Sequence, residues 1–368
     1  MPCEPFDFLV VIPTCRRPRL LGAAIASAVG QVGATKIVIV VDDCPDGSAE
    51  PVVRDFRGAG VIYLRNPAPT DGWPGSVRNR GFEASRDLGL SARFVHFLDD
   101  DDLVPDDHYR RVKQAFGEHP DVGVVFGAIQ SFCEFSDDPV RRRAQEQRFA
   151  CDRRWRANAA RVARIYEALG SALKAPRLTQ WLYALQAMCG PELFLCSGGV
   201  IRHEHVLRLG GFDPRYRLME DYEFYTRAMR SFGAHFLGEV SALYRFGGSD
   251  SLWAPQGLDA TAELARADEI SRALRLRKRA IRAEVGNDLA FLVLTMIYRL
   301  AIGPLVYGLG APGALLRSAG RMTSPRRRRL RTRPSQSAKH VGVERIVLRH
   351  DLIGALAPVN VRSRIVAG

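Results

Sequence analysis

Alternation between short apolar runs and segments with helical spacing in the first hundred residues constrains the fold most. The apolar runs are rich in β-branched residues and read FLVVIP (8–13), KIVIVV (36–41), GVIYL (60–64) and RFVHFL (93–98). Segments with helical features separate them, at 19–31, 48–56 and 75–89. Strands that are apolar on both faces and separated by helices are typical of a parallel sheet that helices cover on both sides. The sequence therefore predicts an α/β fold.

Polar residues follow three of these runs, and ligands of such sheets bind beyond the carboxyl ends of the strands. The first run ends in Pro13 and Thr14, the second in Asp42 and Asp43, and the fourth in Asp99–Asp102. Together these ends predict a nucleotide pocket. No G-x-G-x-x-G follows the first run, which disfavours a dinucleotide fold, and no G-x-x-x-x-G-K-S/T sequence is present.

The four consecutive aspartates need compensation, because each ionised carboxylate makes ionisation of its neighbours more costly. A helix predicted to begin at Pro105 would be capped by Asp102 and Asp106. Capping does not account for Asp99 and Asp100, which lie at the end of the strand. Mg²⁺ or Mn²⁺, held by one or two carboxylates and by substrate phosphates, would account for them. Capping and cation binding both remain open from the residues alone.

Two further acidic pairs each allow a structural and a functional interpretation. Asp42 and Asp43 stand in VVDDCPDGS (40–48), which fits a turn or a carboxylate that binds a base or ribose. Glu220 and Asp221 fit the first turn of a surface helix. The preceding GGFDPRY could instead aim them inward, where one carboxylate would act as a general base.

In this order along the chain, the stretches resemble family 2 glycosyltransferases of the GT-A fold, over roughly residues 7–245. The resemblance is carried by VVIPTCRRPRLL, by VDD at 41–43, by SVRNRGFEA, by FLDDDDLVP, and by GGFD followed by ED at 220–221. It implies a GT-A type, Rossmann-like nucleotide-binding sheet with flanking helices. It also implies transfer of a sugar from a nucleotide sugar to a lipid-linked or polysaccharide acceptor, and the expected donor is a UDP-sugar. Since no Q-x-x-R-W follows, a processive cellulose or chitin synthase is disfavoured.

The resemblance also implies roles for individual residues. Asp99 and Asp101 would form the D-x-D pair that binds Mg²⁺ or Mn²⁺, with Asp100 able to substitute, and the four-Asp run leaves the register open. Asp221 would be the catalytic base and Glu220 its neighbour. One metal and one base imply a single displacement that inverts the anomeric carbon. The implied nucleotide-binding residues are Pro13, Thr14, Asp42, Asp43, Arg78, Asp99 and Asp100.

The sequence divides into a predicted transferase domain at 1–250, a helical segment at 251–316 and a basic tail at 317–368. The domain contains a basic helical insert at about 141–190. The tail holds 13 Lys and Arg residues against two acidic ones, whereas the first 316 residues hold 40 against 38. Residues 289–316 are apolar but include Arg299, Pro304 and Pro312. This favours a helix or broken hairpin that dips into one leaflet, over a full span or a buried core helix.

A basic tail beside an apolar segment predicts binding to an anionic membrane surface. The N-terminus lacks the features of a secretory signal, and the seven cysteines include no C-x-x-C pair. We therefore expect a cytoplasmic protein that is peripheral or monotopic at the inner face of the cytoplasmic membrane. One alternative is nucleic-acid binding through RRRRLRTRP (326–334), although the tail has few aromatics to stack on bases. Another is a non-catalytic or nucleotidyltransferase use of the same fold.

Overall fold

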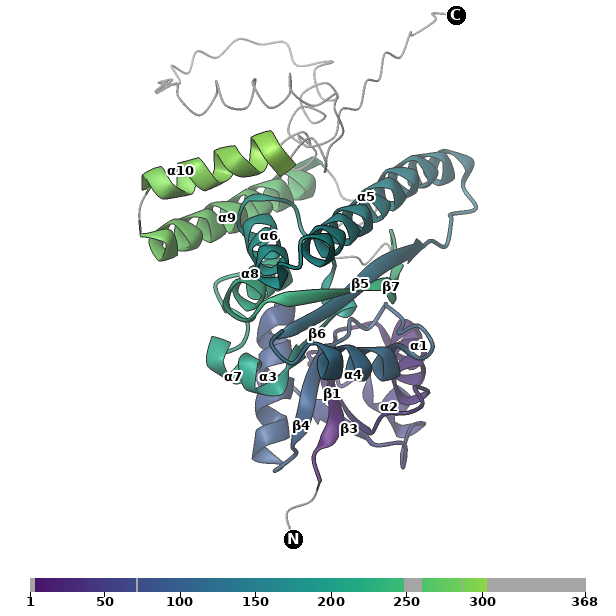
Figure 1. The fold of residues 1–368 in the computed structure, drawn as a ribbon. Coiled ribbons are helices and arrows are strands. Elements are labelled where there is room, and N and C mark those ends of the chain that lie inside the picture. The colour runs from purple at the N-terminus through teal and green to yellow at the C-terminus, as the bar shows by residue number, and fades with distance from the viewer. Residues whose placement is uncertain (1–3, 71, 248–259, 287, 303–368) are drawn as a thin grey trace, which may run out of the picture.

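The computed structural model describes residues 4–70, 72–247, 260–286 and 288–302 (Figure 1). Its strands are β1 (Phe6–Thr14), β2 (Lys36–Asp42), β3 (Val61–Arg65), β4 (Ala92–Phe97), β5 (Val124–Phe132), β6 (Gly199–Arg202) and β7 (Ala234–Arg245). The helices of the first half are α1 (Pro18–Val29), α2 (Glu50–Arg54), α3 (Pro74–Asp87), α4 (His108–Glu118) and α5 (Pro139–Ala172). The later ones are α6 (Pro176–Cys189), the 3₁₀ turn η1 (Cys196–Gly198), α7 (His203–Leu209), α8 (Glu220–Phe232), α9 (Ala260–Val285), α10 (Asp288–Ile297) and the π-helical turn η2 (Tyr298–Ile302).

The strands form one seven-stranded sheet in the order β3-β2-β1-β4-β6-β5-β7. The four predicted strands are present and parallel, and α1, α2 and α3 lie between them in the sequence as expected. The prediction of parallel strands concerned these four alone, and β6 pairs antiparallel with both β4 and β5. Strand β6 has four residues, follows the η1 turn directly and runs opposite to both of its neighbours. The sheet is therefore mixed, with β6 as the reversed strand.

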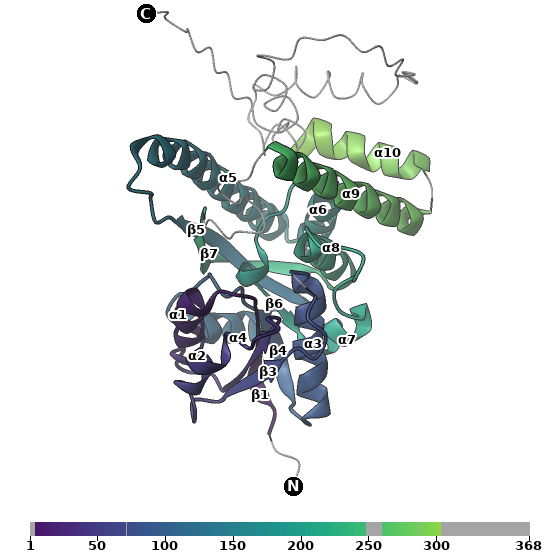
Figure 2. The same cartoon turned by 180° about the vertical axis from the view of Figure 1, so that it is seen from behind.

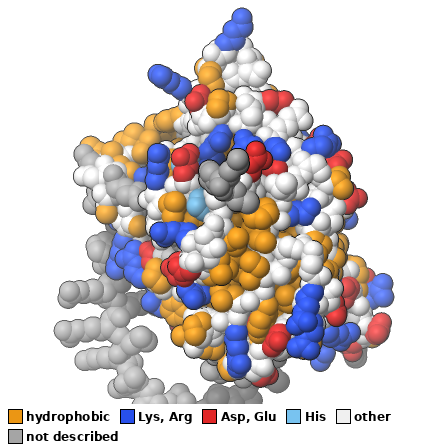
Figure 3. Space-filling view, turned by 90° about the horizontal axis from the view of Figure 1, so that it is seen from below, with side chains coloured by type: hydrophobic (Ala, Val, Ile, Leu, Met, Phe, Trp, Pro, Cys, Tyr) orange, Lys and Arg blue, Asp and Glu red, His pale blue; other side chains and the backbone are white. Residues whose placement is uncertain are grey.

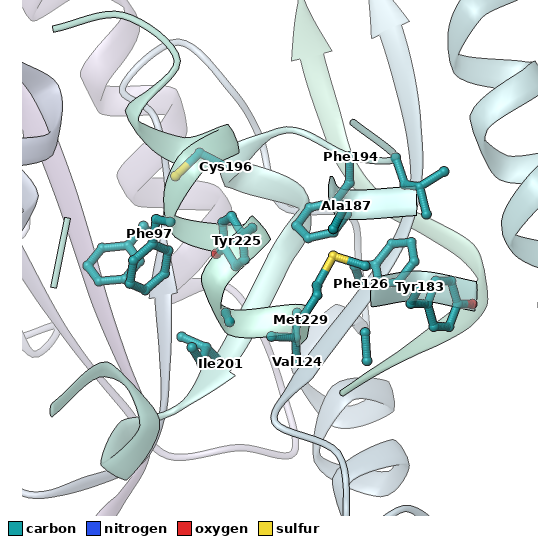
Figure 4. Close-up of a cluster of buried hydrophobic side chains, with 14 of the residues drawn as sticks. Phe97, Val124, Phe126, Tyr183, Ala187, Phe194, Cys196, Ile201, Tyr225 and Met229 are labelled. Atoms are coloured by element: carbon teal, nitrogen blue, oxygen red, sulfur yellow. The ribbon is translucent and has the colours of Figure 1, made fainter. Parts of the chain in front are cut away.

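Period-two alternation along the strands sorts their apolar side chains into two cores. Leu9 and Val11 of β1 contribute to the core under α3, α5, α6 and α8. Phe8, Val10 and Ile12 point the other way, into the core under α1, α2 and α4. Figure 4 shows part of the first core, where Phe97, Phe126 and Ile201 of three strands meet side chains of α6 and α8. Burial on both faces explains why these strands are apolar throughout.

Helix α3 packs closely on the sheet at Gly81, where there is no room for a side chain. A Cβ atom at Gly81 would lie 2.5 Å from Cγ1 of Val11 and 2.8 Å from Cγ2 of Val41. The side-chain amide of Asn79 also holds the loop before α8, since it donates to the Phe212 carbonyl and accepts from the Phe212 amide, both at 2.8 Å. Close packing and this clamp fix α3 between the sheet and the Gly-Gly turn at 210–211.

Helices α5 and α6 cover most of residues 141–190, and α9 and α10 lie within the segment 251–316. Helices α9 and α10 lie side by side at the end of the molecule opposite the N-terminus (Figures 1 and 2). Within the described residues, no helix is both long and apolar enough to cross a bilayer. Only the first half of the apolar stretch 289–316 is described, and the basic tail lies outside the described residues.

The face at the other end of the molecule, away from α9 and α10, carries mixed charges (Figure 3). Figure 3 shows an area of apolar side chains there, with Lys and Arg side chains interspersed with Asp and Glu side chains around it. This agrees with the near balance of charges in the first 316 residues. The described part of that face has no field of a single sign.

Candidate active site

The carboxyl ends of β1, β2 and β4 converge at one edge of the sheet, as the sequence predicts. Thr14 and Asp42 are register partners at the ends of β1 and β2. The Asp43 amide donates to the Thr14 carbonyl at 2.8 Å. After β4, the amide of Asp99 donates to the Ser197 hydroxyl at 3.1 Å, so η1 supports this strand end. The predicted nucleotide-binding and acidic residues therefore share one edge.

Each of the four aspartates has a compensating partner, and Asp100 and Asp101 share Arg17. The Asp100 carboxylate is buried and accepts from the Thr14 hydroxyl at 2.6 Å and from Arg17 at 3.1 Å. Arg17 also pairs with Asp101 at 3.0 Å. Asp102 is buried and accepts from the backbone amide of Arg245 at 3.0 Å. Arginine side chains, the Thr14 hydroxyl and a backbone amide thus offset the like charges of these aspartates without a bound cation.

The predicted helix cap is wrong in position. Helix α4 begins at His108 instead of Pro105, and Asp107 precedes it without a side-chain capping bond. The Asp102 carboxylate faces the end of β7, because Leu103 forms a bridge to Leu243 that brings the two segments together. Asp102 therefore anchors β7 to the end of β4 and does not cap a helix.

Arg78 joins two acidic segments that are far apart in the sequence. Its guanidinium contacts Asp99 at 2.5 Å and Glu220, 142 residues away, at 2.7 Å. It also stacks 5.3 Å from the ring centroid of Phe212. Only 3% of the Arg78 side chain is exposed, so these charge pairs are little screened by solvent. The end of β4 and the start of α8 are therefore parts of one site.

Glu220 and Asp221 open α8 after Met219, whose φ of 64° turns the chain sharply. The structural interpretation, a surface helix start, is not met for Glu220, which is buried. Burial raises the pKa of Glu220 to about 7 against the lowering effect of Arg78. Burial also raises the pKa of Asp221, and the Asp99 charge adds to this, whereas Arg78 opposes it. The Tyr222 amide donates to the Asp221 carboxylate at 2.8 Å.

Asp42 and Asp43 have different surroundings. Asp42 is fully buried and accepts from the amides of Cys44 and Ala49, at 3.0 and 2.8 Å, and from the Tyr63 hydroxyl. It therefore shapes the turn after β2. Asp43 accepts from the Asn66 amide at 2.7 Å and from the Thr70 hydroxyl at 2.8 Å. Its carboxylate faces the loop after β3, and the role in base binding stays a prediction for both residues.

Glu192 is a site residue that the sequence reasoning missed. It lines a small pocket with Asp221, Tyr222 and Tyr225. Burial and the Asp221 charge raise the pKa of Glu192 to about 7, against the effect of Arg156, whose guanidinium lies 3.8 Å away. Residue 192 stands in CGPELF, which matches no motif, so only its neighbours in space reveal it. Arg17 was visible beside Thr14, but its pairing with Asp100 depends on the folded sheet.

The carboxylates after β4 fit a divalent cation that substrate phosphates also bind. Asp99 and Asp101 keep 32% and 18% of their side chains exposed, whereas Asp100, at 6%, turns toward Thr14 and Arg17. Mg²⁺ is typically held by one or two carboxylates together with phosphate oxygens. In the part of the chain that the structure describes, no group of three or more His, Cys, Asp or Glu side chains forms a metal site by itself.

Comparison with known proteins defines the class. Residues 9–169 match the family model described as glycosyl transferase family 2. This match confirms the resemblance for residues 9–169, which are less than half of the chain, and the seven-stranded sheet with flanking helices agrees with the predicted GT-A type fold. The class that fold and family define is a glycosyltransferase domain.

Two curated relatives match part of the chain. The minor teichoic acid biosynthesis protein GgaB of Bacillus subtilis (strain 168) is 30% identical over 123 residues, or 31% of this chain. The succinoglycan biosynthesis protein ExoO of Rhizobium meliloti (strain 1021) is 33% identical over 109 residues, or 29% of this chain. The matches cover only 12% and 28% of the relatives' own lengths.

Solved structures that align with the chain have low sequence identity and TM-scores below 0.5. S. aureus TarS 1–349 is 16% identical with a TM-score of 0.42, over 72% of this chain and 65% of that one. The mannosyltransferase PcManGT from Pyrobaculum calidifontis, in complex with GDP-Man and Mn²⁺, is 16% identical with a TM-score of 0.45. That match covers 87% of this chain and 81% of the other.

Proposed function

We propose that the protein is an inverting, metal-dependent glycosyltransferase that moves a sugar from a nucleotide sugar to an acceptor hydroxyl. The donor we expect is a UDP-sugar. The observation that carries this proposal is the Arg78 bridge between Asp99 and Glu220. It brings the acidic strand end and the acidic helix start of a family 2 sequence into one site. A nucleotide binder without activity would not need the second acidic group there.

In this mechanism Asp221 takes the proton of the acceptor hydroxyl. Its carboxylate lines the pocket beside Glu192 and is only partly buried, so an acceptor can approach it. The raised pKa of Asp221 makes it a stronger base once it is ionised. Glu220 does not face the acceptor in this scheme. It orients Arg78, which in turn holds the end of β4 in place.

Asp99 and Asp101 would hold the Mg²⁺ or Mn²⁺, and Asp100 would keep its bonds to Thr14 and Arg17. When bound, such an ion neutralises charge that develops on the leaving diphosphate. Arg17 and Arg78 already lie against these carboxylates, so the edge has positive charge available to balance a diphosphate. Asp43 and Thr14 would bind the base and the adjacent ribose.

The acceptor we propose is a lipid-linked sugar or a polysaccharide. The two relatives are named for teichoic acid and succinoglycan biosynthesis, which supports a polymeric acceptor. A lipid-linked acceptor would be presented at an anionic membrane surface, so we propose a cytoplasmic enzyme peripheral or monotopic there. Nucleic-acid binding through residues 326–334, which lie outside the described residues, is the alternative that the family match disfavours.

Release of nucleoside diphosphate from a panel of nucleotide sugars, with Mn²⁺ or with EDTA, tests the proposal. Asp221→Asn should lower turnover by roughly 10²–10⁴-fold, because a positioned base contributes about that much. Nucleotide binding, followed by thermal shift, should persist in this variant. Asp87→Asn, at an exposed end of α3, is the matched control and should retain full turnover. Full activity in EDTA would reject the metal, and wild-type turnover of Asp221→Asn would reject the base.

A further inference from the structure

An exposed apolar stripe runs along α10 and η2. It consists of residues at the spacing i, i+3, i+4, i+7, i+8 and i+11, which share one side of a helix. Their exposed fractions range from 40% to 72%, which is high for large apolar side chains. The stripe comprises Leu289, Leu292, Val293, Met296, Ile297 and Leu300.

The opposite side of the same segment is packed on the body. Tyr298 and Ile302 are buried in the core that lies under α6, and the Tyr298 hydroxyl donates to Gln186 at 3.0 Å. Leu294 packs against that core as well. The described part of α10 is therefore oriented, with one apolar side satisfied and the stripe turned to solvent. A core helix would not leave six large apolar side chains exposed.

Helix α9 presents a stripe of arginines beside this segment. Arg272, Arg275, Arg279 and Arg282 are all exposed and follow the spacing i, i+3, i+7 and i+10 on one side of the helix. Burial lowers the pKa of Lys278 in the same helix. The positive charges of Arg282 and of Arg299 in η2 lower it further, so cations of α9 and η2 lie near each other. Helices α9 and α10 lie side by side (Figures 1 and 2), so the arginine stripe and the apolar stripe belong to the same end of the molecule.

The α9–α10 pair is firmly attached, so this surface has a defined orientation. The guanidinium of Arg277 in α9 is buried, lies 3.9 Å from the ring centroid of Tyr222 and donates to the Thr226 hydroxyl at 3.1 Å. Tyr222 follows Asp221 directly in α8. A surface that docks through α9 and α10 is therefore held at a fixed distance from the candidate active site.

We propose that the α10 stripe is a docking face for an anionic lipid bilayer, with the arginines of α9 contacting the headgroups. An apolar helix side flanked by cations has the chemistry that an anionic interface binds, because apolar insertion and charge attraction add. The tail at 317–368, with 13 cationic and two acidic residues, extends the same charge in sequence. The inference deepens the proposal of a membrane-surface acceptor, and its test needs neither donor nor acceptor.

Co-sedimentation of the full chain with vesicles tests this docking face. The vesicles contain phosphatidylcholine alone or a mixture with phosphatidylglycerol. We expect binding to the mixed vesicles, of which high salt releases only part, since salt screens charges but not apolar insertion. The double variant Leu292→Gln, Met296→Gln should bind about tenfold more weakly in high salt. Arg275→Gln with Arg279→Gln should weaken binding in low salt, by roughly fivefold for each cation.

The matched control is Leu88→Gln with Val140→Gln, the same kind of change at two exposed apolar positions elsewhere, one directly after α3 and one in α5. It should leave vesicle binding unchanged, and the thermal midpoints should agree among all variants. Binding of Leu292→Gln, Met296→Gln equal to wild type would overturn the proposal. Light scattering without lipid gives a second check. If wild type were a dimer and Leu292→Gln, Met296→Gln a monomer, a second copy would cover the face and the proposal would also be overturned. Nucleotide binding intact in a chain that ignores vesicles would refute docking alone.

Discussion

Arg78 shows how much one buried charge can organise. Its guanidinium has a carboxylate on either side, and removal of a buried ion's partner is far more costly than loss of a surface pair. In the wild-type protein Arg78 pairs with the carboxylates of Asp99 and Glu220. The variant Arg78→Met would leave both carboxylates among like-charged neighbours without their shared cation. Asp99 would lose its link to α8, and Glu220 would lose its cation.

We predict that Arg78→Met lowers the free energy of unfolding by about 3–5 kcal/mol and abolishes turnover. Urea unfolding followed by circular dichroism measures the first effect. Arg80→Met is the matched control two residues away, since Arg80 is partly exposed and its pairs with Glu83 and Asp87 lie on the surface. That change should cost less than about 1 kcal/mol. Equal losses in the two variants would contradict the role assigned to the bridge.

At the scale of elements, the sequence predicted what local pattern and burial determine. The four parallel strands were predictable because they are apolar runs, and α3 was predictable because residues 75–89 between two of these runs have helical features. The direction of β6 was not predictable, because the sequence GVIR carries no sign of whether the strand runs parallel or antiparallel to its neighbours. The pairings of Asp100 with Arg17 and of Glu192 with Arg156 likewise form only when distant segments meet. The acidic motifs were visible in sequence, but their compensating partners were not.

Packing of α3 on the sheet yields the prediction that belongs to this scale. Gly81→Ala should lower the free energy of unfolding by about 1–3 kcal/mol, because the new Cβ would meet Val11 and Val41 at 2.5 and 2.8 Å. Gly117→Ala in α4 is the control, since a Cβ there meets no atom within 4 Å. The control should stabilise by about 0.5–1 kcal/mol through helix propensity. Stabilisation of similar size by both substitutions would show that α3 is not pressed on the sheet.

For the whole molecule, the arrangement separates two tasks. The sheet edge gathers the charged groups of the site, while α9 and α10 lie at the end away from the N-terminus. Helix α8 belongs to both regions, because Glu220 and Asp221 open it and Tyr222 and Thr226 contact Arg277 of α9. Protonation of Glu220, the buried acid at the start of α8, therefore affects the stability of the folded state as a function of pH.

Glu220 gives that dependence a definite sign. Its pKa in the folded protein, about 7, lies above the ordinary value of 4.5, so folding favours the protonated form. The corresponding stabilisation is complete below about pH 4.5 and is lost as the pH rises through about 7. Glu220→Gln cannot titrate, so we predict that the stability of wild type relative to this variant falls by on the order of 2–3 kcal/mol between about pH 4.5 and about pH 8. Urea unfolding of nucleotide-free and metal-free protein across this range measures the difference. Glu83→Gln, at an exposed position of α3, should show a difference that does not vary with pH. A wild-type advantage over Glu220→Gln that grows with pH would mean that the pair with Arg78 outweighs burial and holds the Glu220 pKa below its ordinary value.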